Sequence, residues 1–184
     1  MEFQRNTVKL HNKYFKPFIS DKEIHKAVVA IAEKLNNDFA SKTPILLGVL
    51  NGCFMFASDL VKELNISCEV SFVKLASYKG TQSTGEIKSL IGLNENLKGR
   101  DVIILEDIVD TGHTIDNLSA QLHALGVNSV TVVAFLFKPN AYRGSTIINY
   151  TGIEVGNEFL VGYGLDYDGL GRNLKDLYII IDEV

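Results

Sequence analysis

The chain has 184 residues, of which 46% are hydrophobic and 22% charged, and its formal net charge is −4. This composition is that of a globular domain with a substantial core, and the acidic balance argues against a broad basic surface, so we expect no nucleic-acid partner. The sequence lacks the apolar run of about 18 residues that a membrane-spanning helix needs, so we expect no membrane partner. The N-terminal stretch has no apolar core of the kind found in secretory signals, and we therefore expect a cytoplasmic protein.

The two cysteines, Cys53 and Cys68, are too few for a disulfide framework and form no C-x-x-C pair. Both lie in apolar stretches of the sequence. We expect both thiols to be buried and inert.

The first half of the chain predicts two helices and two strands. Residues 20–23, S-D-K-E, form a capping-box sequence, and apolar residues recur behind it at helical spacing to about Phe39. Residues 45–50, ILLGVL, are a short continuous apolar run typical of a buried parallel strand. An apolar face predicts a second helix over 54–64, and alternation predicts a strand over 68–75.

The second half begins with a polar stretch, 77–88, SYKGTQSTGEIK. It contains two glycines and no apolar periodicity, so we expect a mobile loop or a loose hairpin. The elements expected after it are a buried strand over 102–106, a helix that begins near Ile115 and ends before Gly126, and strands over 129–137, 158–164 and 177–181.

Strands and helices alternate through the middle of the chain. This order predicts an α/β fold, with a parallel twisted sheet flanked by helices. Since no repeat, low-complexity segment or linker divides the sequence, we expect a single domain over 1–184. We expect the termini to add a small flap or hood.

The stretch 102–115, VIILEDIVDTGHTI, brings carboxylates to the end of a buried strand. Glu106, Asp107 and Asp110 follow its apolar residues, and in open α/β sheets ligands bind beyond the carboxyl ends of the strands. The next residues lead into a helix, whose N-terminus offers unpaired N–H groups and the positive end of the helix dipole. A tight turn with a glycine and hydroxyl side chains suits a phosphate at this place. The residues of this predicted monophosphate cradle are Thr111, Gly112, His113 and Thr114.

Carboxylates beside a phosphate repel it unless another group lies between them. Ribose hydroxyls and Mg²⁺ are the natural intermediaries, because Mg²⁺ prefers hard oxygen ligands. The motif is neither the G-x-x-x-x-G-K-[ST] of P-loops nor the G-x-G-x-x-G of dinucleotide-binding folds. Taken alone, Asp110 is better explained as a helix N-cap beside solvated acids than as a functional residue.

The same stretch, 102–115, closely resembles the signature of the type I phosphoribosyltransferases, which bind 5-phosphoribosyl-1-pyrophosphate (PRPP). Three other segments resemble the hypoxanthine-guanine phosphoribosyltransferases: the flexible loop at 77–88, the pyrophosphate-side loop GVLNGCFMFASDL at 48–60, and the purine-site segment FLVGYGLDYDGLGRNL at 159–174. Lys138 stands where that family has its base-contacting lysine. The resemblance is collinear from about residue 45 to the C-terminus, and on it the chain is identified as a member of that family.

The resemblance implies a Mg²⁺-dependent transfer of phosphoribose from PRPP to N9 of hypoxanthine or guanine, with inversion through an oxocarbenium-like transition state. It implies that Asp110 is the catalytic residue, which handles the proton near purine N7. Glu106 and Asp107 would hold the ribose hydroxyls, partly through Mg²⁺, and residues 111–114 would bind the 5′-phosphate.

The same resemblance assigns the remaining site residues. Lys138 would donate to the 6-oxo group, because an ammonium group is only a donor and so favours an oxo over an amino group. On the purine side, Phe159 would stack on the ring and Leu160 would offer its backbone to the base edge. Asp166, in the same purine-site segment, would ligate a second Mg²⁺ on the pyrophosphate side. The residues implied to bind pyrophosphate are Leu50, Asn51, Gly52, Ser77, Tyr78 and Arg172.

Two positions depart from the family pattern, since Asn51 and His113 stand where many relatives carry lysine. We expect the backbone N–H contacts at both positions to survive, although the charge of a histidine varies near neutral pH. At Asn51 a side-chain contribution to pyrophosphate binding or to subunit contacts is in doubt. Apolar and aromatic residues in 53–60 lead us to expect a homodimer or a homotetramer.

Four other functions compete with this interpretation. A regulatory protein that keeps the PRPP-binding fold but binds RNA or DNA would need a basic face or an added module. A relative specific for xanthine would use the same site, because the contact at the purine 2-position is largely made by backbone, whereas an enzyme for a 6-oxopyrimidine fits the purine-site segment poorly. A flavodoxin-like binding domain would not explain the presence of the segments 77–88 and 159–174.

Overall fold

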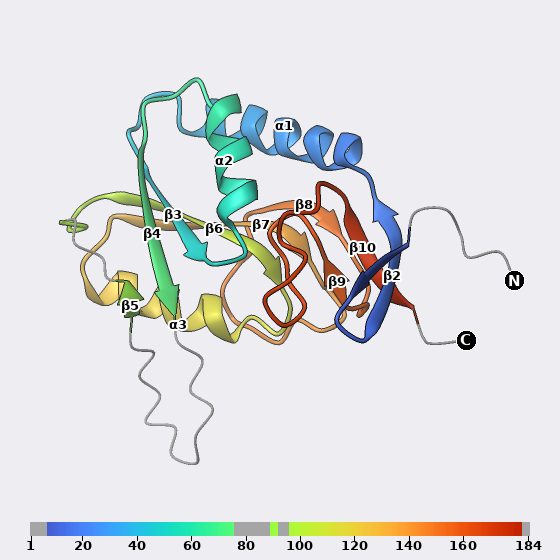
Figure 1. Cartoon of the computed structure of the whole chain (residues 1–184). Helices are drawn as coiled ribbons and strands as arrows, with labels where there is room; N and C mark the ends of the chain where they lie inside the picture. The colour runs from blue at the N-terminus through green and yellow to red at the C-terminus, as the bar shows by residue number, and fades with distance from the viewer. Residues whose placement is uncertain (1–6, 76–88, 92–95, 182–184) are drawn as a thin grey trace, which may run out of the picture.

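The computed structural model describes residues 7–75, 89–91 and 96–181, which form two β-sheets and three α-helices (Figure 1). The larger sheet has the strand order β5-β4-β3-β6-β7-β8. Its strands are β3 (Ile45–Leu50), β4 (Glu69–Leu75), β5 (Ser89–Ile91), β6 (Asp101–Val109), β7 (Ser129–Phe137) and β8 (Tyr150–Glu154).

The larger sheet is parallel from β4 to β8. Its strand pairs β4/β3, β3/β6, β6/β7 and β7/β8 are all parallel, and β5 alone joins the edge in the antiparallel sense. The central strands β3, β6 and β7 each contain a run of five buried residues, as expected for strands covered on both faces. The predicted parallel sheet flanked by helices is confirmed.

Three helices cover the two faces of this sheet: α1 (Asp21–Asp38), α2 (Phe54–Glu63) and α3 (His113–Ala124). Buried residues of α1 and α2 pack with Leu46 and Ile103, while those of α3 pack with Ile45 and Ile104. Because neighbouring residues of a strand point to opposite faces, these two sets place α1 and α2 on one face and α3 on the other.

The first helix begins where the sequence predicts. The Ser20 side chain accepts a hydrogen bond from the Glu23 N–H, and the Glu23 carboxylate accepts one from the Ser20 N–H, at 2.9 Å. This reciprocal capping box fixes the start of α1, and apolar residues at helical spacing bury its inner face.

The smaller sheet joins the two ends of the described chain and forms the predicted hood. Its strand order is β1-β2-β10-β9, all pairs antiparallel, around a small core of Leu10, Phe15 and Val161. Strands β3 and β6 point toward the side of the molecule on which this sheet lies (Figure 1). Its strands are β1 (Val8–Leu10), β2 (Lys13–Ile19), β9 (Leu160–Val161) and β10 (Leu177–Ile181).

Some predictions were wrong in detail. The strand predicted over 158–164 is limited to Leu160–Val161, because the backbone then turns through positive φ at Gly162, Tyr163 and Gly164. Strand β8 was not predicted, and α3 begins at His113, two residues before Ile115.

The two cysteines also differ from each other. Cys53 is buried as predicted, but Cys68 is only half-buried, because it lies just before the first residue of β4. In the described part of the chain, no helix has both the length and the apolar character needed to cross a membrane.

Candidate active site

Glu106 and Asp107 lie near the carboxyl end of β6, and both carboxyl groups are poorly solvated. Glu106 is buried, and among the described residues its Oε2 has no hydrogen-bond partner. Burial, reinforced by the neighbouring charge of Asp107, raises the pKa of Glu106 well above its usual range. Burial also raises the pKa of Asp107 to about 6. A cation or a set of hydroxyl donors would relieve both groups, so this strand end suits such a ligand.

The loop after β3 lies against Asp107. A Cβ atom at Gly52 would overlap the Asp107 carboxylate, so the close approach requires glycine. The peptide bond between Leu50 and Asn51 is cis, and Asn51 is exposed. Parallel pairing of β3 with β6 brings this loop to the same edge of the sheet as the carboxylates.

The segment after β9 brings Arg172 and Asp166 to the same place. The Arg172 guanidinium is paired with Asp166 (Nη2–Oδ1 2.5 Å) and donates to the Gly164 carbonyl (2.7 Å). The Gly164 backbone packs on the carbonyl of Gly52, since a Cβ atom there would overlap that oxygen. Against the effect of burial, hydrogen bonds from the backbone of Ile108 and Asp107 and the positive charge of Arg172 lower the pKa of Asp107, whereas the charge of Asp166 raises it. Gly52, Arg172 and Asp166 therefore lie close to the Asp107 carboxylate.

Asp110 and Lys138 form an ion pair where β6 and β7 end. Lys138 Nζ lies 3.1 Å from Asp110 Oδ2, and the lysine side chain is 10% exposed while that of the aspartate is 51% exposed. The Lys138 N–H also donates to the Val109 carbonyl (3.0 Å), which continues the pairing of β7 with β6. Strand pairing thus fixes the backbone of both residues. The exposed Asp110 carboxylate pairs with the buried Lys138 ammonium on its solvent-facing side.

Residues 111–114 form the turn into α3. Gly112 is the N-cap residue and is buried, with a φ of 91° that glycine adopts without steric cost. Thr111, His113 and Thr114 are exposed. Since α3 begins at His113, the unpaired N–H groups of its first turn lie at the same sheet edge as the carboxylates. This is the arrangement predicted for a phosphate cradle.

Phe159 offers an aromatic ring at the edge of the hood. The residue is 46% exposed, while Leu160 beside it is buried in β9. The Phe159 ring contacts those of Phe15 (6.5 Å between centroids) and Tyr167 (5.8 Å, nearly perpendicular). An exposed ring supported by two others offers a fixed apolar surface to a flat ligand. Tyr167 follows Asp166 in the chain, so the ring cluster continues into the Asp166–Arg172 pair.

The predicted residues that follow β3, β6 and β7 therefore lie at one edge of the larger sheet, and Arg172 and Asp166 reach this edge beside Asp107, while Phe159 and Leu160 belong to the hood. Ser77 and Tyr78, with the rest of the stretch 77–88, lie outside the described residues. A family model for the phosphoribosyl transferase domain matches residues 19–168. The chain belongs to the phosphoribosyltransferase family.

Individual relatives give a consistent result. A hypoxanthine-guanine phosphoribosyltransferase of Staphylococcus aureus is 34% identical over 176 residues, which cover 95% of this chain and 98% of that protein. The crystal structure of a hypoxanthine phosphoribosyltransferase from Staphylococcus aureus is similar with a TM-score of 0.85 at 34% identity, covering 90% of this chain and 91% of that one. A hypoxanthine-guanine phosphoribosyltransferase from Bacillus anthracis also has a TM-score of 0.85, at 29% identity, covering 90% and 98% of the two chains.

The oxygen ligands of this phosphoribosyltransferase fit Mg²⁺, but they do not form a closed metal site. Among the described residues, no group of three or more His, Cys, Asp or Glu side chains is placed to hold a metal ion. Asp166 already accepts hydrogen bonds from Arg172 and from the Gly169 N–H (2.7 Å). Glu106, with its unpartnered Oε2, and Asp107 remain the donors that fit, and Mg²⁺ commonly completes its shell with waters and substrate phosphates.

Sequence reasoning missed the segment Tyr142–Thr146, which lies behind the cradle. The Arg143 N–H donates to the Thr111 carbonyl (3.1 Å), and the Tyr142 ring packs on Gly112. The one signal in the sequence is the short R-G-S-T turn between two strands, which is common in loops without any function.

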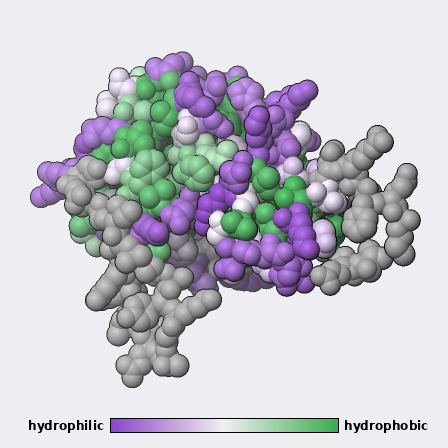
Figure 2. Space-filling model, viewed as in Figure 1, coloured by the Kyte–Doolittle hydropathy of each residue, from purple (hydrophilic) through white to green (hydrophobic). Residues whose placement is uncertain are grey.

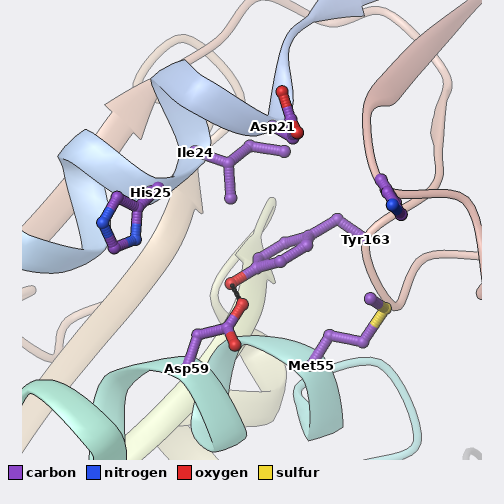
Figure 3. A pocket seen from close by; sticks show the side chains of 7 residues that line it. Asp21, Ile24, His25, Met55, Asp59 and Tyr163 are labelled. Atoms are coloured by element: carbon purple, nitrogen blue, oxygen red, sulfur yellow. Dashed lines mark hydrogen bonds between the residues drawn. The ribbon is translucent and has the colours of Figure 1, made fainter.

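A small hollow lies outside the site, between α1 and α2 (Figure 3). Its volume is about 160 Å³, and Tyr163 Oη donates a hydrogen bond to Asp59 Oδ2 (2.8 Å) at its wall. None of the predicted site residues lines it. The lining residues are Asp21, Ile24, His25, Met55, Asp59, Tyr163 and Lys175.

Proposed function

We propose that this phosphoribosyltransferase is a hypoxanthine-guanine enzyme of purine salvage, which converts a 6-oxopurine and PRPP to the nucleoside monophosphate and pyrophosphate. The observation that carries the proposal is the buried Lys138 ammonium, held by Asp110 between the carboxylates of β6 and the turn into α3. A base-recognising cation, a proton acceptor and a phosphate cradle then lie at one edge of one sheet.

In this proposal Lys138 determines which purine base is bound. Its ammonium can donate to a 6-oxo group but cannot accept a hydrogen bond from a 6-amino group, which favours hypoxanthine and guanine over adenine. Leaving a buried ammonium opposite an amino group would cost both partners their hydrogen bonds. Phe159 would stack on the purine, and the Leu160 backbone would meet the base edge.

Asp110 would take the proton that the purine loses near N7 as N9 attacks C1 of the ribose. The N9–C1 bond forms while the bond from C1 to the pyrophosphate oxygen breaks, with inversion at carbon. Asp110 is suited to this role because it is half exposed and already hydrogen-bonded to Lys138, which lies beside the base. When base binding redirects the ammonium to the 6-oxo group, the carboxylate is free to accept the proton.

The phosphoribosyl group would lie between the carboxylates and the turn into α3. Residues Thr111, Gly112, His113 and Thr114 would bind the 5′-phosphate through backbone N–H groups and hydroxyls. Glu106 and Asp107 would face the ribose hydroxyls and Mg²⁺. Bound Mg²⁺ would supply positive charge that neutralises pyrophosphate as it leaves.

The pyrophosphate side would be formed by the loop after β3 and by Arg172. Gly52 and its neighbours Leu50 and Asn51 offer backbone groups beside Asp107, and the Arg172 guanidinium lies close to the same carboxylate. Asp166 would join a second Mg²⁺ only by sharing its oxygens with Arg172 and the Gly169 N–H. By the family resemblance of the sequence, Ser77 and Tyr78 would also bind pyrophosphate.

We further infer a single domain over 1–184, a homo-oligomer and a cytoplasmic location. The contact between the two sheets' loops supports one domain, because Gly164, which follows β9 of the hood, packs directly on Gly52 in the loop after β3. Phe54 of α2 and Val70 of β4 are exposed, and Figure 2 shows apolar residues gathered over these two elements, which supports a contact between copies of the chain. Both cysteines are free thiols, as is usual for proteins of a reducing compartment.

A panel of bases tests the proposed function. The purified protein would be incubated with PRPP, Mg²⁺ and each of hypoxanthine, guanine, xanthine and adenine, with an EDTA control. Mg²⁺-dependent turnover of hypoxanthine and guanine, with adenine inert, would support it. Turnover of xanthine alone would make the chain a xanthine-specific relative, and PRPP binding without any turnover would make it a regulatory protein of the same fold.

A further inference from the structure

The segment Tyr142–Thr146, which follows β7, is packed against the turn predicted to bind phosphate. The Arg143 N–H donates to the Thr111 carbonyl at 3.1 Å. A Cβ atom at Gly112 would lie 3.1 Å from Gly144 Cα and would overlap the Tyr142 ring. The segment therefore touches the cradle through both its backbone and an aromatic side chain.

Asp116, in the first turn of α3, anchors this segment to the helix by hydrogen bonds. The Ser145 N–H donates to Asp116 Oδ1 and Oδ2 at 3.1 and 3.0 Å, and the Thr146 N–H donates to Oδ1 at 2.8 Å. The Tyr142 hydroxyl donates to the Thr146 carbonyl, which closes the segment on itself. Hydrogen bonds from Thr146 lead the influences that lower the pKa of Asp116, so the carboxylate is the form held here.

The same segment starts from Lys138. The Lys138 carbonyl accepts hydrogen bonds from the Ala141 and Tyr142 N–H groups, both at 3.1 Å. The chain therefore passes in one tight turn from the ammonium at the end of β7 to the aromatic ring on Gly112. A displacement of the segment would change the cradle before it changed the sheet, since the sheet has its own pairing between β6 and β7.

A phosphate cradle depends on the directions of backbone N–H groups, and those directions follow the φ and ψ angles of residues 111–114. Gly112 at a φ of 91° has many alternative conformations, because glycine is the least restricted residue. We propose that Asp116 and Tyr142 are positioning residues, which hold segment 142–146 against the cradle so that it is already shaped for the 5′-phosphate. This inference rests on the proposed function, because it concerns the phosphate end of the same site.

The contribution of the 5′-phosphate can be measured apart from that of the base. Isothermal titration calorimetry would give the affinities for inosine 5′-monophosphate and for inosine, which differ only in the phosphate. In Asp116→Ala we expect the preference for the monophosphate to fall roughly tenfold, the size expected from losing bonds to a charged group, with inosine affinity unchanged. In Tyr142→Phe, which keeps the ring on Gly112, the loss should be smaller than in Tyr142→Ala.

Asp101 provides a matched control. It is also an aspartate that accepts short hydrogen bonds, from Asn128 Nδ2 (2.7 Å) and Ser129 Oγ (2.5 Å), but at the opposite end of β6. Asp101→Ala should lower thermal stability and leave the phosphate preference intact. Because Asp116→Ala could also fail to fold, Asp116→Asn is measured beside it, since this variant keeps the shape and one oxygen acceptor.

Steady-state kinetics add a second readout. Loss of phosphate positioning should raise the KM for PRPP with little change in kcat, whereas a purely structural role would lower the active fraction and leave the KM as it was. If the wild-type protein prefers the monophosphate and the Asp116 and Tyr142 variants keep that preference, the positioning role is overturned. If the wild-type protein itself shows no preference for the monophosphate over inosine, the proposed function fails instead.

Discussion

The ammonium of Lys138 lies 3.1 Å from the Asp110 carboxylate, and the pair joins the ends of two neighbouring strands. The lysine is buried and the aspartate half exposed, so the aspartate supplies the charge that makes the buried ammonium tolerable. In the proposed reaction the purine enters between these two groups. Lys138 then recognises the 6-oxo group of the base, and Asp110 accepts the proton of the base. Substitutions of the two residues should therefore have different effects.

The first prediction concerns Asp110. Asp110→Asn should lower kcat by about 100-fold or more, the usual range for losing a general base, because the amide cannot accept the proton. The affinity for PRPP should change much less, since Asp110 is not among the groups proposed to hold the phosphates. Stopped assays for kcat and calorimetry for PRPP would separate the two effects. Glu33→Gln, an exposed residue of α1, is the control for removing one negative charge.

The second prediction concerns Lys138. Lys138→Ala should reduce the preference for hypoxanthine over adenine by roughly 10- to 100-fold, because a hydrogen bond to a charged group is lost for the oxo base alone. The ratio of kcat/KM for the two bases is the quantity to compare. Lys34→Ala, which removes an exposed lysine of α1, should leave that ratio as it is. An unchanged ratio in the Lys138 variant would exclude this residue from the purine site.

The third prediction is that one substitution, Glu106→Gln, has opposite effects on stability and on PRPP binding. Its carboxyl group is buried, lacks a partner for Oε2 among the described residues, and lies beside Asp107. Glu106→Gln should therefore raise the melting temperature of the unliganded protein by roughly 2–4 °C for each kcal/mol gained. The same change should weaken binding of PRPP with Mg²⁺, because it removes a charged oxygen ligand. A melting temperature that falls, measured beside Glu33→Gln, would show that the carboxylate is well accommodated without ligand.

Much of the fold follows from the sequence because the central strands are buried on both faces. Residues 45–50 are a continuous apolar run and residues 129–137 are rich in β-branched and aromatic side chains, and both form strands with the predicted bounds. The start of α1 was predictable from a capping box, which is a local signal. In contrast, β8 (YTGIE) is partly exposed and contains a glycine, so neither composition nor alternation marks it as a strand.

The site was predictable where its residues follow one another, as in 106–114. Only the resemblance placed Lys138 and Asp110 in one site, and their contact was not predicted, because 28 residues separate the two and the sequence at a strand end does not indicate which residue it will meet. The strand predicted over 158–164 is wrong because the glycines at 162 and 164 adopt positive φ to meet Asp176 and Gly52, which are tertiary contacts. The packing of Tyr142 on Gly112 was missed for the same reason.

The last prediction concerns the pH dependence of stability at Asp116. Hydrogen bonds lower the pKa of this carboxyl group in the folded protein, so the unfolded chain binds the proton more readily. The group therefore contributes stability above about pH 4, near the pKa of an unfolded aspartate, and loses that contribution as the pH falls through the folded pKa. Asp116→Asn should be less stable than wild type in urea unfolding at pH 7, and the two curves should converge in acid. Asp101→Asn should behave in the same way, because hydrogen bonds from Ser129 and Asn128 lower the pKa of Asp101 too. A difference at Asp116 that stays constant from pH 7 into acid would mean that the carboxylate form is not what holds segment 142–146.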